Sequence, residues 1–239
     1  TRLIQTSGYS AIVFVALIFF FLLREGIPTL GEVKLSNLLS ARWYPIENYF
    51  GILPLITGSL VVTIGAMLIA FPLGIGTAVY ISEIAPRWMR EILKPLVELL
   101  GGLPSVVLGF LGILLVSPFL RVFLDLPTGL TAFTGSLLLG GIAVPTIVSV
   151  AEDALDAVPR SYREGAWALG ATRWQTIWRV TLPAAKSGVL TAVMLGIGRA
   201  IGETMTVMMV TGNAARMPLG LDAFFRPVRT MTATIAAEM

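Results

Sequence analysis

The stretch GILPLITGSLVVTIGAMLIAFPLGIGTAVY, residues 51–80, decides the class of fold. It holds no charged residue, and a helix needs only about 20 apolar residues to cross a hydrocarbon core about 30 Å thick. A membrane-spanning barrel strand would instead alternate polar and apolar residues over about ten positions. We therefore expect a transmembrane helix here.

Four further runs are long and apolar enough to span: about Ser7–Leu23, Leu96–Leu120, Gly129–Val150 and Ala184–Val210. The composition agrees, because 56% of the 239 residues are hydrophobic and 13% are charged, against roughly 25% charged in soluble domains. The first run lacks the small-residue cleavage site of a signal peptide, so we interpret it as a span. The sequence predicts an all-α, polytopic transmembrane bundle, organised as one domain over residues 1–239.

Proline and glycine recur inside these runs in three groups. They are Pro72 with Gly74 and Gly76, Gly101–Gly102 with Pro104, and Pro145. One interpretation is helix kinks and close packing, since neighbouring helices can satisfy the backbone groups that are freed. The other interpretation is that these residues are hinges of a protein that changes shape.

The Lys and Arg residues between the runs indicate the orientation of the chain. Of the 17 in total, nine flank the side that holds the N-terminus, seven flank the other side, and Arg199 lies inside the fifth run. The segment Arg87–Lys94 concentrates three of the nine. Because positive residues are enriched on the cytoplasmic side, we expect a cytoplasmic N-terminus and external loops at about 24–50 and 212–239.

The segment at about 159–183 differs from its surroundings because it is amphipathic and carries two helix-start signals. Ser161–Glu164 and Thr172–Gln175 both fit a capping box, with a hydroxyl at the N-cap and Glu or Gln at N3. Gly170, between them, can end the first helix in the left-handed conformation. The sequence therefore predicts a short helix, a glycine turn and a second short helix.

The second short helix is expected to have one largely apolar face. At helical spacing this face would consist of Trp174, Ile177, Trp178 and Thr181. The spacing fits two structures equally well. One is an interfacial helix that lies on lipid with its tryptophans at headgroup depth, and the other is an element that docks on a partner protein.

The same segment resembles the EAA loop of ABC importer permeases. That family has Glu-Ala-Ala, three residues, Gly, nine residues and Ile-x-Leu-Pro, and here Gly165 and Val180 are the mild departures. The resemblance implies that the loop at about 159–183 is a coupling element seated in a groove of an ATPase subunit. The residues that it places there are Glu164, Gly165, Ala166, Gly170, Val180, Leu182 and Pro183.

Other segments resemble the phosphate-importer permeases of the PstC type. They are Arg199–Met205 followed by Thr211–Asn213, Trp43–Pro45, and Glu98 followed by Leu103–Ser105. The resemblance extends over nearly the whole chain and implies six helices in the natural protein, of which about five are covered here. It also implies a bacterial or archaeal plasma membrane and four kinds of partner: a homologous PstA-like permease, two PstB-like ATP-binding subunits, a PstS-like external phosphate-binding protein, and inorganic phosphate.

Arg199 and Glu203 place two charges deep inside the fifth run. Each costs at least about 2.5–3.5 kcal/mol at the bilayer centre. As i and i+4 neighbours on one helix they share a face, so one interpretation is an internal ion pair that holds helices together. The other is anion recognition, because a guanidinium fits two phosphate oxygens and Glu203 can accept a hydrogen bond from a protonated phosphate. Thr204 and Thr206 would add hydroxyls to this substrate path.

Two further features bear on the candidate path. Gly198 and Gly202 stand four residues apart, a spacing that lets another helix backbone approach closely. Glu98 is a second acidic candidate, but it lies near Lys94 on the same predicted helix face, which favours a structural pair between the two.

Several chemistries lack the residues that they need. The chain has no Cys and no His, which removes disulfides, thiol chemistry and the commonest metal ligand. It also lacks the Gly-x-x-x-x-Gly-Lys-Ser/Thr phosphate loop, so ATP and Mg²⁺ are expected on partner subunits. We expect a permease in membrane lipid with no catalytic residue, no metal, no bound cofactor and no nucleic-acid partner. A permease for another oxyanion, such as sulfate or molybdate, and a self-contained channel or ion-coupled transporter are the alternatives.

Overall fold

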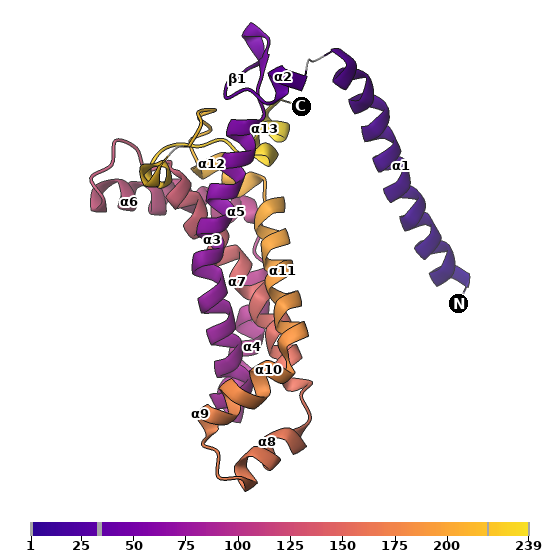
Figure 1. The fold of residues 1–239 in the computed structure, drawn as a ribbon, viewed down its shortest axis with the longest axis vertical. Coiled ribbons are helices and arrows are strands. Elements are labelled where there is room, and N and C mark those ends of the chain that lie inside the picture. Colours follow the sequence, from indigo (N-terminus) through magenta and orange to yellow (C-terminus); the bar gives the residue numbers. More distant parts are fainter. Residues whose placement is uncertain (1, 33–34, 219, 239) are drawn as a thin grey trace. The chain divides into compact units, whose positions relative to one another are not determined.

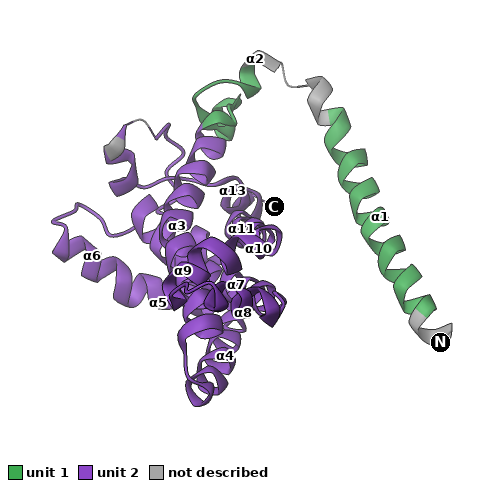
Figure 2. Ribbon diagram, turned by 60° about the horizontal axis from the view of Figure 1, so that its bottom comes forward, with its two compact units in different colours: residues 1–53 green, residues 54–239 purple. Residues whose placement is uncertain are grey.

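The computed structural model describes residues 2–32, 35–218 and 220–238, and these are helical over most of their length (Figure 1). The chain divides into two compact units, residues 1–53 and residues 54–239 (Figure 2). Each unit is described by itself below.

Unit 1 is a long helix followed by a small hairpin. Its elements are α1 (Arg2–Glu32), α2 (Leu35–Leu38), β1 (Trp43–Tyr44), η1 (Pro45–Glu47) and β2 (Tyr49–Phe50). The apolar stretch Gln5–Pro28 of α1 is long enough to cross a membrane. The helix thus passes the predicted end at Leu23 and takes up the first part of the expected loop 24–50. The two strands pair antiparallel, with Trp43 opposite Phe50.

Unit 2 contains the remaining helices. They are α3 (Leu53–Val79), η2 (Tyr80–Ile84), α4 (Arg87–Gly101), α5 (Ser105–Leu111), η3 (Gly112–Val116), α6 (Ser117–Phe123), α7 (Ala132–Asp156), α8 (Arg160–Ala168), α9 (Arg173–Thr176), η4 (Ile177–Thr181), α10 (Leu182–Ala184), α11 (Lys186–Gly202), α12 (Met205–Val210), η5 (Leu221–Phe225) and α13 (Met231–Glu238). The elements η2, η3 and η4 are π-helical turns that continue the helix before them.

Helix α7 is the centre of unit 2, and 56% of its most apolar stretch is buried. It runs beside α3 and α11 (Figure 1). Ile147 of α7 is fully buried, and Gly74 of α3 and Gly196 of α11 both face it so closely that an added Cβ would stand 2.7 Å and 2.5 Å from its side chain. Without a side chain at these two glycines the three helices can approach closely, as small residues allow in membrane bundles.

Across the described residues four helices are long and apolar enough to cross a membrane. They are Gln5–Pro28, Leu53–Ile84, Ser105–Phe123 and Ala132–Asp156, and a fifth span results if the bent pair Arg173–Ala184 and Lys186–Gly202 counts as one. The two parts of that pair meet at 74°. The all-α polytopic fold is therefore confirmed.

The third predicted span, about Leu96–Leu120, is wrong at its start. Residues 96–101 belong to the separate amphipathic helix α4, and the chain breaks at Gly102–Pro104 before the span Ser105–Phe123 begins. Pro104 has no backbone N–H and disfavours helix in the residue before it, which explains the break. By contrast, Pro72 and Pro145 lie inside unbroken helices, so these two prolines do not interrupt their spans.

The segment expected as an external loop, 212–239, contains a helix at its end. Met231–Glu238 forms the helix α13, and its residue Ala233 is buried in a core with residues of α3, α7, α11 and α12. The segment before it also attaches to the bundle, since Val228 donates its N–H to the carbonyl of Thr211 at 2.9 Å. This part of the chain therefore covers one end of unit 2, which we call the α13 end.

Candidate functional site

Arg199 is exposed on α11. The neighbouring Gly198 and Gly202 have nothing within 4 Å of an added Cβ, and Leu195 on the same side is 49% exposed. Ala192 and Gly196, on the adjoining side of α11, pack in the bundle. The exposed side chain of Arg199 thus lies where the packed side of α11 meets the side of Gly198 and Gly202, which the described residues of unit 2 leave uncovered.

The fifth predicted span breaks directly after Arg199. Helix α11 ends at Gly202, and Glu203 has extended backbone, with φ −72° and ψ 127°. Its carbonyl accepts from the hydroxyl of Thr232 on α13 at 3.1 Å instead of from a helical N–H. The expected face with charges at i and i+4 is therefore absent, and no ion pair between Arg199 and Glu203 occurs among the salt bridges of the described residues.

Glu203 instead turns its carboxylate toward the start of α12. The side chain is buried, and its Oε1 accepts from the backbone N–H of Thr206 at 3.4 Å. The Thr206 hydroxyl also lies 3.4 Å from Oε1, but the carbonyl of Ser105 is closer, at 2.9 Å. Because a hydroxyl has a single proton to donate, we assign this proton to the hydrogen bond with Ser105. Thr204 is half-buried, and its hydroxyl donates to the Gly202 carbonyl at 3.4 Å.

The Thr206–Ser105 bond joins two helix breaks. Ser105 begins α5 after the break at Gly102–Pro104, and Thr206 lies in the first turn of α12 after the break at Glu203–Thr204. An added Cβ on Gly109 of α5 would stand 3.1 Å from the Cα of Thr206, which shows how closely the two helices pack. The sequence predicted the first interruption, at Gly101–Gly102 with Pro104, but not the second, and it held no signal that the two meet.

The predicted loop 159–183 folds as a short helix, a glycine turn and a second short helix. α8 is followed by Gly170 in the left-handed region at φ 81°, and Thr172 and Gln175 form the predicted reciprocal capping box. The first predicted capping box is wrong, because the N-cap of α8 is Pro159 and Ser161 lies inside the helix. The fixed φ of proline favours a helix start here, so α8 begins before Ser161.

The apolar face predicted for the second short helix is divided. Ile177 and Thr181 are buried against the bundle, whereas Trp174 and Trp178 are 60% and 57% exposed and pack edge to face at 5.8 Å. Ile177 and Thr181 thus form the buried part of the predicted face, and Trp174 and Trp178 form its exposed part.

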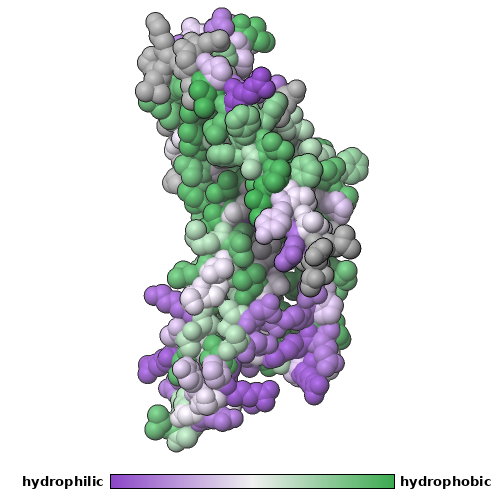
Figure 3. All heavy atoms as spheres, turned by 90° about the vertical axis from the view of Figure 1, so that its right-hand side faces the viewer, coloured by the Kyte–Doolittle hydropathy of each residue, from purple (hydrophilic) through white to green (hydrophobic). Residues whose placement is uncertain are grey.

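The coupling-loop residues implied by the resemblance lie at different depths. Glu164, Gly165, Gly170 and Pro183 are exposed, and Ala166, Val180 and Leu182 are half-buried. The α8 part of this loop lies at the opposite end of unit 2 from α13, and we call this the α8 end (Figure 1). On the face drawn in Figure 3, hydrophilic side chains gather toward the lower end.

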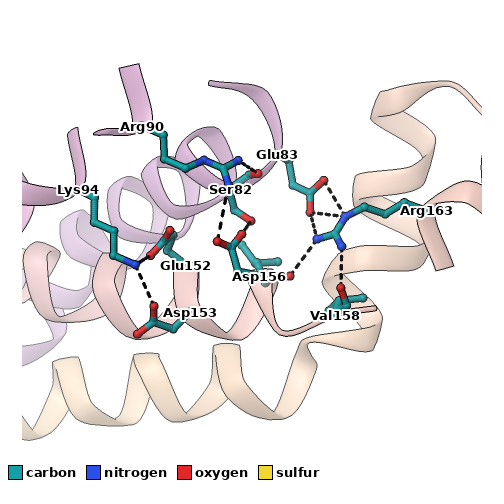
Figure 4. A network of polar contacts seen from close by, with 10 residues as sticks. Ser82, Glu83, Arg90, Lys94, Glu152, Asp153, Asp156, Val158 and Arg163 are labelled. Atoms are coloured by element: carbon teal, nitrogen blue, oxygen red, sulfur yellow. Dashed lines mark hydrogen bonds and ion pairs between the residues drawn. The ribbon is translucent and has the colours of Figure 1, made fainter. Parts of the chain in front are cut away.

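A polar network at the α8 end connects helices that are far apart in sequence (Figure 4). Arg163 of α8 forms an ion pair with Glu83 of η2, with Nη2 2.5 Å and Nε 3.0 Å from Oε1. The same guanidinium donates to the carbonyls of Leu155 at 2.9 Å and Val158 at 2.7 Å. One side chain of α8 thus contacts the end of α3 and the end of α7.

Two cations of α4 complete the network. Arg90 bonds to the Ser82 carbonyl, and its Nη1 lies 3.7 Å from Asp156, whose carboxylate accepts from the Ser82 hydroxyl at 2.6 Å. Lys94 lies 2.7 Å from the buried Glu152, and the hydrogen bond to that carboxylate raises the pKa of Lys94 above its usual range. Lys94 therefore stays charged through neutral and mildly alkaline pH.

Lys94 also lies 3.1 Å from Asp153. The expected pair between Lys94 and Glu98 is wrong, because both acidic partners of Lys94 are on α7. Glu98 is exposed on α4. Proximity on one helix suggested the pair, but the buried carboxylate of Glu152 has the greater need of a cation.

The network lies beside a cavity of about 460 Å³. Its lining comes from η2, α4, α7 and α8: Ser82, Glu83, Arg90, Asp156, Arg160, Arg163, Glu164 and Trp167. Within the described ranges no three His, Cys, Asp or Glu side chains gather as a metal site would require.

Comparison with known proteins agrees with these features. The model of the binding-protein-dependent transport system inner membrane component matches residues 70–237. The probable ABC transporter permease protein YqgH of Bacillus subtilis is 44% identical over 211 residues, 87% of this chain and 67% of that protein. The phosphate transport system permease protein PstC of Mesorhizobium japonicum is 36% identical over 228 residues, 87% of this chain and 69% of that protein.

Among solved structures, a chain of the MetNI methionine ABC transporter in inward facing conformations has the same fold, with a TM-score of 0.50. It is 24% identical and covers 64% of this chain and 68% of its own length. The family model covers the central and C-terminal spans, the polar network and the EAA loop, and the chain therefore belongs to the binding-protein-dependent transport system inner membrane components.

Proposed function

We propose that this chain is the permease subunit of an ATP-driven importer of inorganic phosphate, and that Arg199 contacts the anion in transit. The observation that carries the proposal is the exposed side chain of Arg199 at the edge of the uncovered side of α11, together with relatives named as phosphate transport permeases at 32–36% identity. A planar guanidinium can donate two parallel hydrogen bonds to phosphate oxygens.

The surroundings of Arg199 support this role. Among the described residues no carboxylate forms an ion pair with it, so its donors are available to an anion. Glu203 is bonded to the first turn of α12 in this conformation. Thr204 is half-buried at the same break. In the proposed path Glu203, Thr204 and Thr206 become available to phosphate when that break rearranges.

The uncovered face of α11 supports pairing with a second, homologous permease. Gly198 and Gly202 let a foreign helix approach the Arg199 side closely, so the path would lie between the two permeases. One of the two ATP-binding subunits would dock at the α8 end through the EAA loop, the other would dock on the second permease, and an external binding protein would deliver phosphate at the α13 end. The N-terminus would then be cytoplasmic.

Arg199 is tested by phosphate uptake in membranes where the assembled complex has been verified. Arg199→Gln removes both the charge and the paired N–H donors of the guanidinium, so it should abolish uptake. Arg199→Lys keeps the charge and should retain part of the uptake. Arg87→Gln, on a side chain that is 95% exposed, is the matched control and should transport normally.

The double variant Arg199→Gln with Glu203→Gln separates recognition from charge balance. If Arg199 only neutralised Glu203, removing both charges would restore near wild-type uptake, and that result would contradict the proposal. Competition by sulfate and molybdate on the wild-type complex tests the choice of anion. Uptake by the chain alone in liposomes would instead indicate a self-contained transporter.

A further inference from the structure

Helix α8 has an unusual attachment to the bundle. None of its residues is buried, so it lacks an apolar anchor of its own. Among the hydrogen bonds and ion pairs of the described residues, Arg163 is the side chain that links α8 to the spans. The cavity of about 460 Å³ lies alongside α8, so a large part of the space there is not filled by side chains.

The Arg163–Glu83 pair is well placed to transmit force. The two side chains are only 13% and 9% exposed, and it is the one ion pair of the described residues with both partners that well covered. Burial reduces screening by solvent and salt, and the planar guanidinium holds its partners in a fixed orientation. A tilt of α8 must therefore move the partners of Arg163 or break several hydrogen bonds at once.

Those partners belong to the two most central spans. Glu83 lies in the π-helical turn η2 that ends α3, and Leu155 and Val158 lie at the end of α7. A π-turn holds an extra residue and is frequent at functional positions, so the end of α3 has a local element that can adjust. We infer that Arg163 is the positioning residue through which movement of α8 reaches α3 and α7.

This inference rests on the proposed function, since α8 moves only if an ATP-binding subunit docks there. It is tested by amide hydrogen exchange of the assembled complex, with and without ATP and vanadate and without phosphate. Three segments are followed: Arg160–Ala168, Tyr80–Ile84 and Val150–Val158. In the wild type we expect nucleotide to change exchange in all three.

Two variants separate the contact of Arg163 with Glu83 from its contacts with the carbonyls at the end of α7. Arg163→Met should leave the response of α8 intact and remove the responses of η2 and of the end of α7. Glu83→Ala should remove the response of η2 alone, because Arg163 still reaches the α7 carbonyls. Arg87→Met, which breaks the exposed pair of Arg87 with Glu91, should keep all three responses.

A response at η2 in Arg163→Met complexes would overturn the inference, and so would a wild type in which α8 responds without η2 or does not respond. If the Arg163→Met chain does not assemble into the complex, Arg163→Lys still tests the role of Arg163. Its ammonium can pair with Glu83 but cannot also serve both carbonyls, so η2 should respond while the end of α7 responds at least twofold less. If nucleotide changed hydrogen exchange equally at η2 and at the end of α7 in Arg163→Lys, the inference would be contradicted.

Phosphate uptake per ATP hydrolysed provides a second measurement. It should fall at least tenfold in Arg163→Met while hydrolysis stays within twofold of the wild type. A fall of uptake only in proportion to assembled complex would indicate a merely structural role. If the wild type shows the exchange responses but no phosphate uptake, the proposed substrate is wrong and the role of Arg163 stands.

Discussion

At the scale of single residues, Gly170 decides how the chain turns between α8 and α9. Its φ of 81° lies in the left-handed region, and nothing lies within 4 Å of an added Cβ. The cost of a side chain here would therefore come from the backbone conformation and not from a clash. Gly165, five residues earlier, has equally open surroundings but sits inside α8 without a positive φ.

The two glycines give a matched pair of substitutions. Gly170→Val should destabilise the chain by about 1–3 kcal/mol, because a β-branched residue is strained at positive φ. Gly165→Val should change stability by less than about 0.5 kcal/mol, since valine is no worse than glycine in a helix. Thermal unfolding of the two variants in detergent measures the difference.

In the assembled complex, Gly170→Val should also uncouple ATP hydrolysis from uptake while the spans remain inserted. Normal uptake per ATP in that variant would contradict the assignment of this turn to the coupling loop. Equal unfolding temperatures for the two valine variants would show that φ at residue 170 is unimportant.

Lys94 and Glu152 form the second case at this scale. Glu152 is buried and Lys94 is partly exposed, so Lys94→Met should leave a buried carboxylate with its main partner gone. Breaking a buried ion pair costs about 3–5 kcal/mol. We expect the free energy of unfolding to fall by an amount near the lower end of this range. Adding Glu152→Gln should recover most of it, because no charge then remains buried. Arg87→Met serves as the exposed control and should leave the unfolding temperature unchanged.

The pH dependence of this pair follows from the raised pKa of Lys94. A group whose pKa is higher in the folded protein contributes its full stabilisation below its unfolded pKa and loses it as pH rises through the folded value. The difference between wild type and Lys94→Met should therefore be constant from pH 7 to pH 9. A difference that shrinks over this window would show that the pair does not hold Lys94 charged.

At the scale of elements, α11 has two faces made of small residues. On the packed side a small residue recurs at every fourth position: Gly188, Ala192, Gly196 and Ala200. The uncovered side has Gly198 and Gly202. The sequence contains both patterns and does not say which one the chain itself covers. Packing against α7 uses the first, and the described residues leave the second uncovered.

Substitutions on the two faces should have opposite effects. Gly196→Ala would place a Cβ 2.5 Å from Ile147, which is already held from its other side by Gly74, so we expect a loss of about 1–3 kcal/mol from overpacking. Gly198→Ala meets nothing within 4 Å and should gain up to about 1 kcal/mol in helix propensity. Unfolding of the isolated chain measures both, and similar effects at the two positions would contradict the assignment of faces.

At the scale of the whole molecule, the chain contains transport elements and lacks the phosphate loop that binds ATP. The family to which it belongs is the inner membrane component of a transport system. We therefore expect the purified chain to show no ATP hydrolysis above a preparation that lacks it, and hydrolysis to appear when ATP-binding subunits are added. Release of inorganic phosphate measures this, and activity that co-purifies with the chain alone would contradict the proposed division of labour.

The sequence by itself determined the all-α membrane class, because long runs without charge leave few other structures possible in lipid. Local chemistry also predicted the positive φ of Gly170 and the Thr172–Gln175 capping box, since both depend on neighbours within a few residues. The family followed from the spacing of the EAA loop. These features rest on composition or on short-range geometry, which the order of residues contains directly.

Only the tertiary structure decided which charges meet. Lys94 pairs with Glu152 instead of Glu98, and Arg163 pairs with Glu83 across 80 positions of sequence. Arg199 and Glu203 separate because α11 ends between them and α13 supplies a hydroxyl to the Glu203 carbonyl. Such pairings depend on which helix ends come together in space and on how deeply each carboxylate is buried. Spacing along one helix contains no information on either.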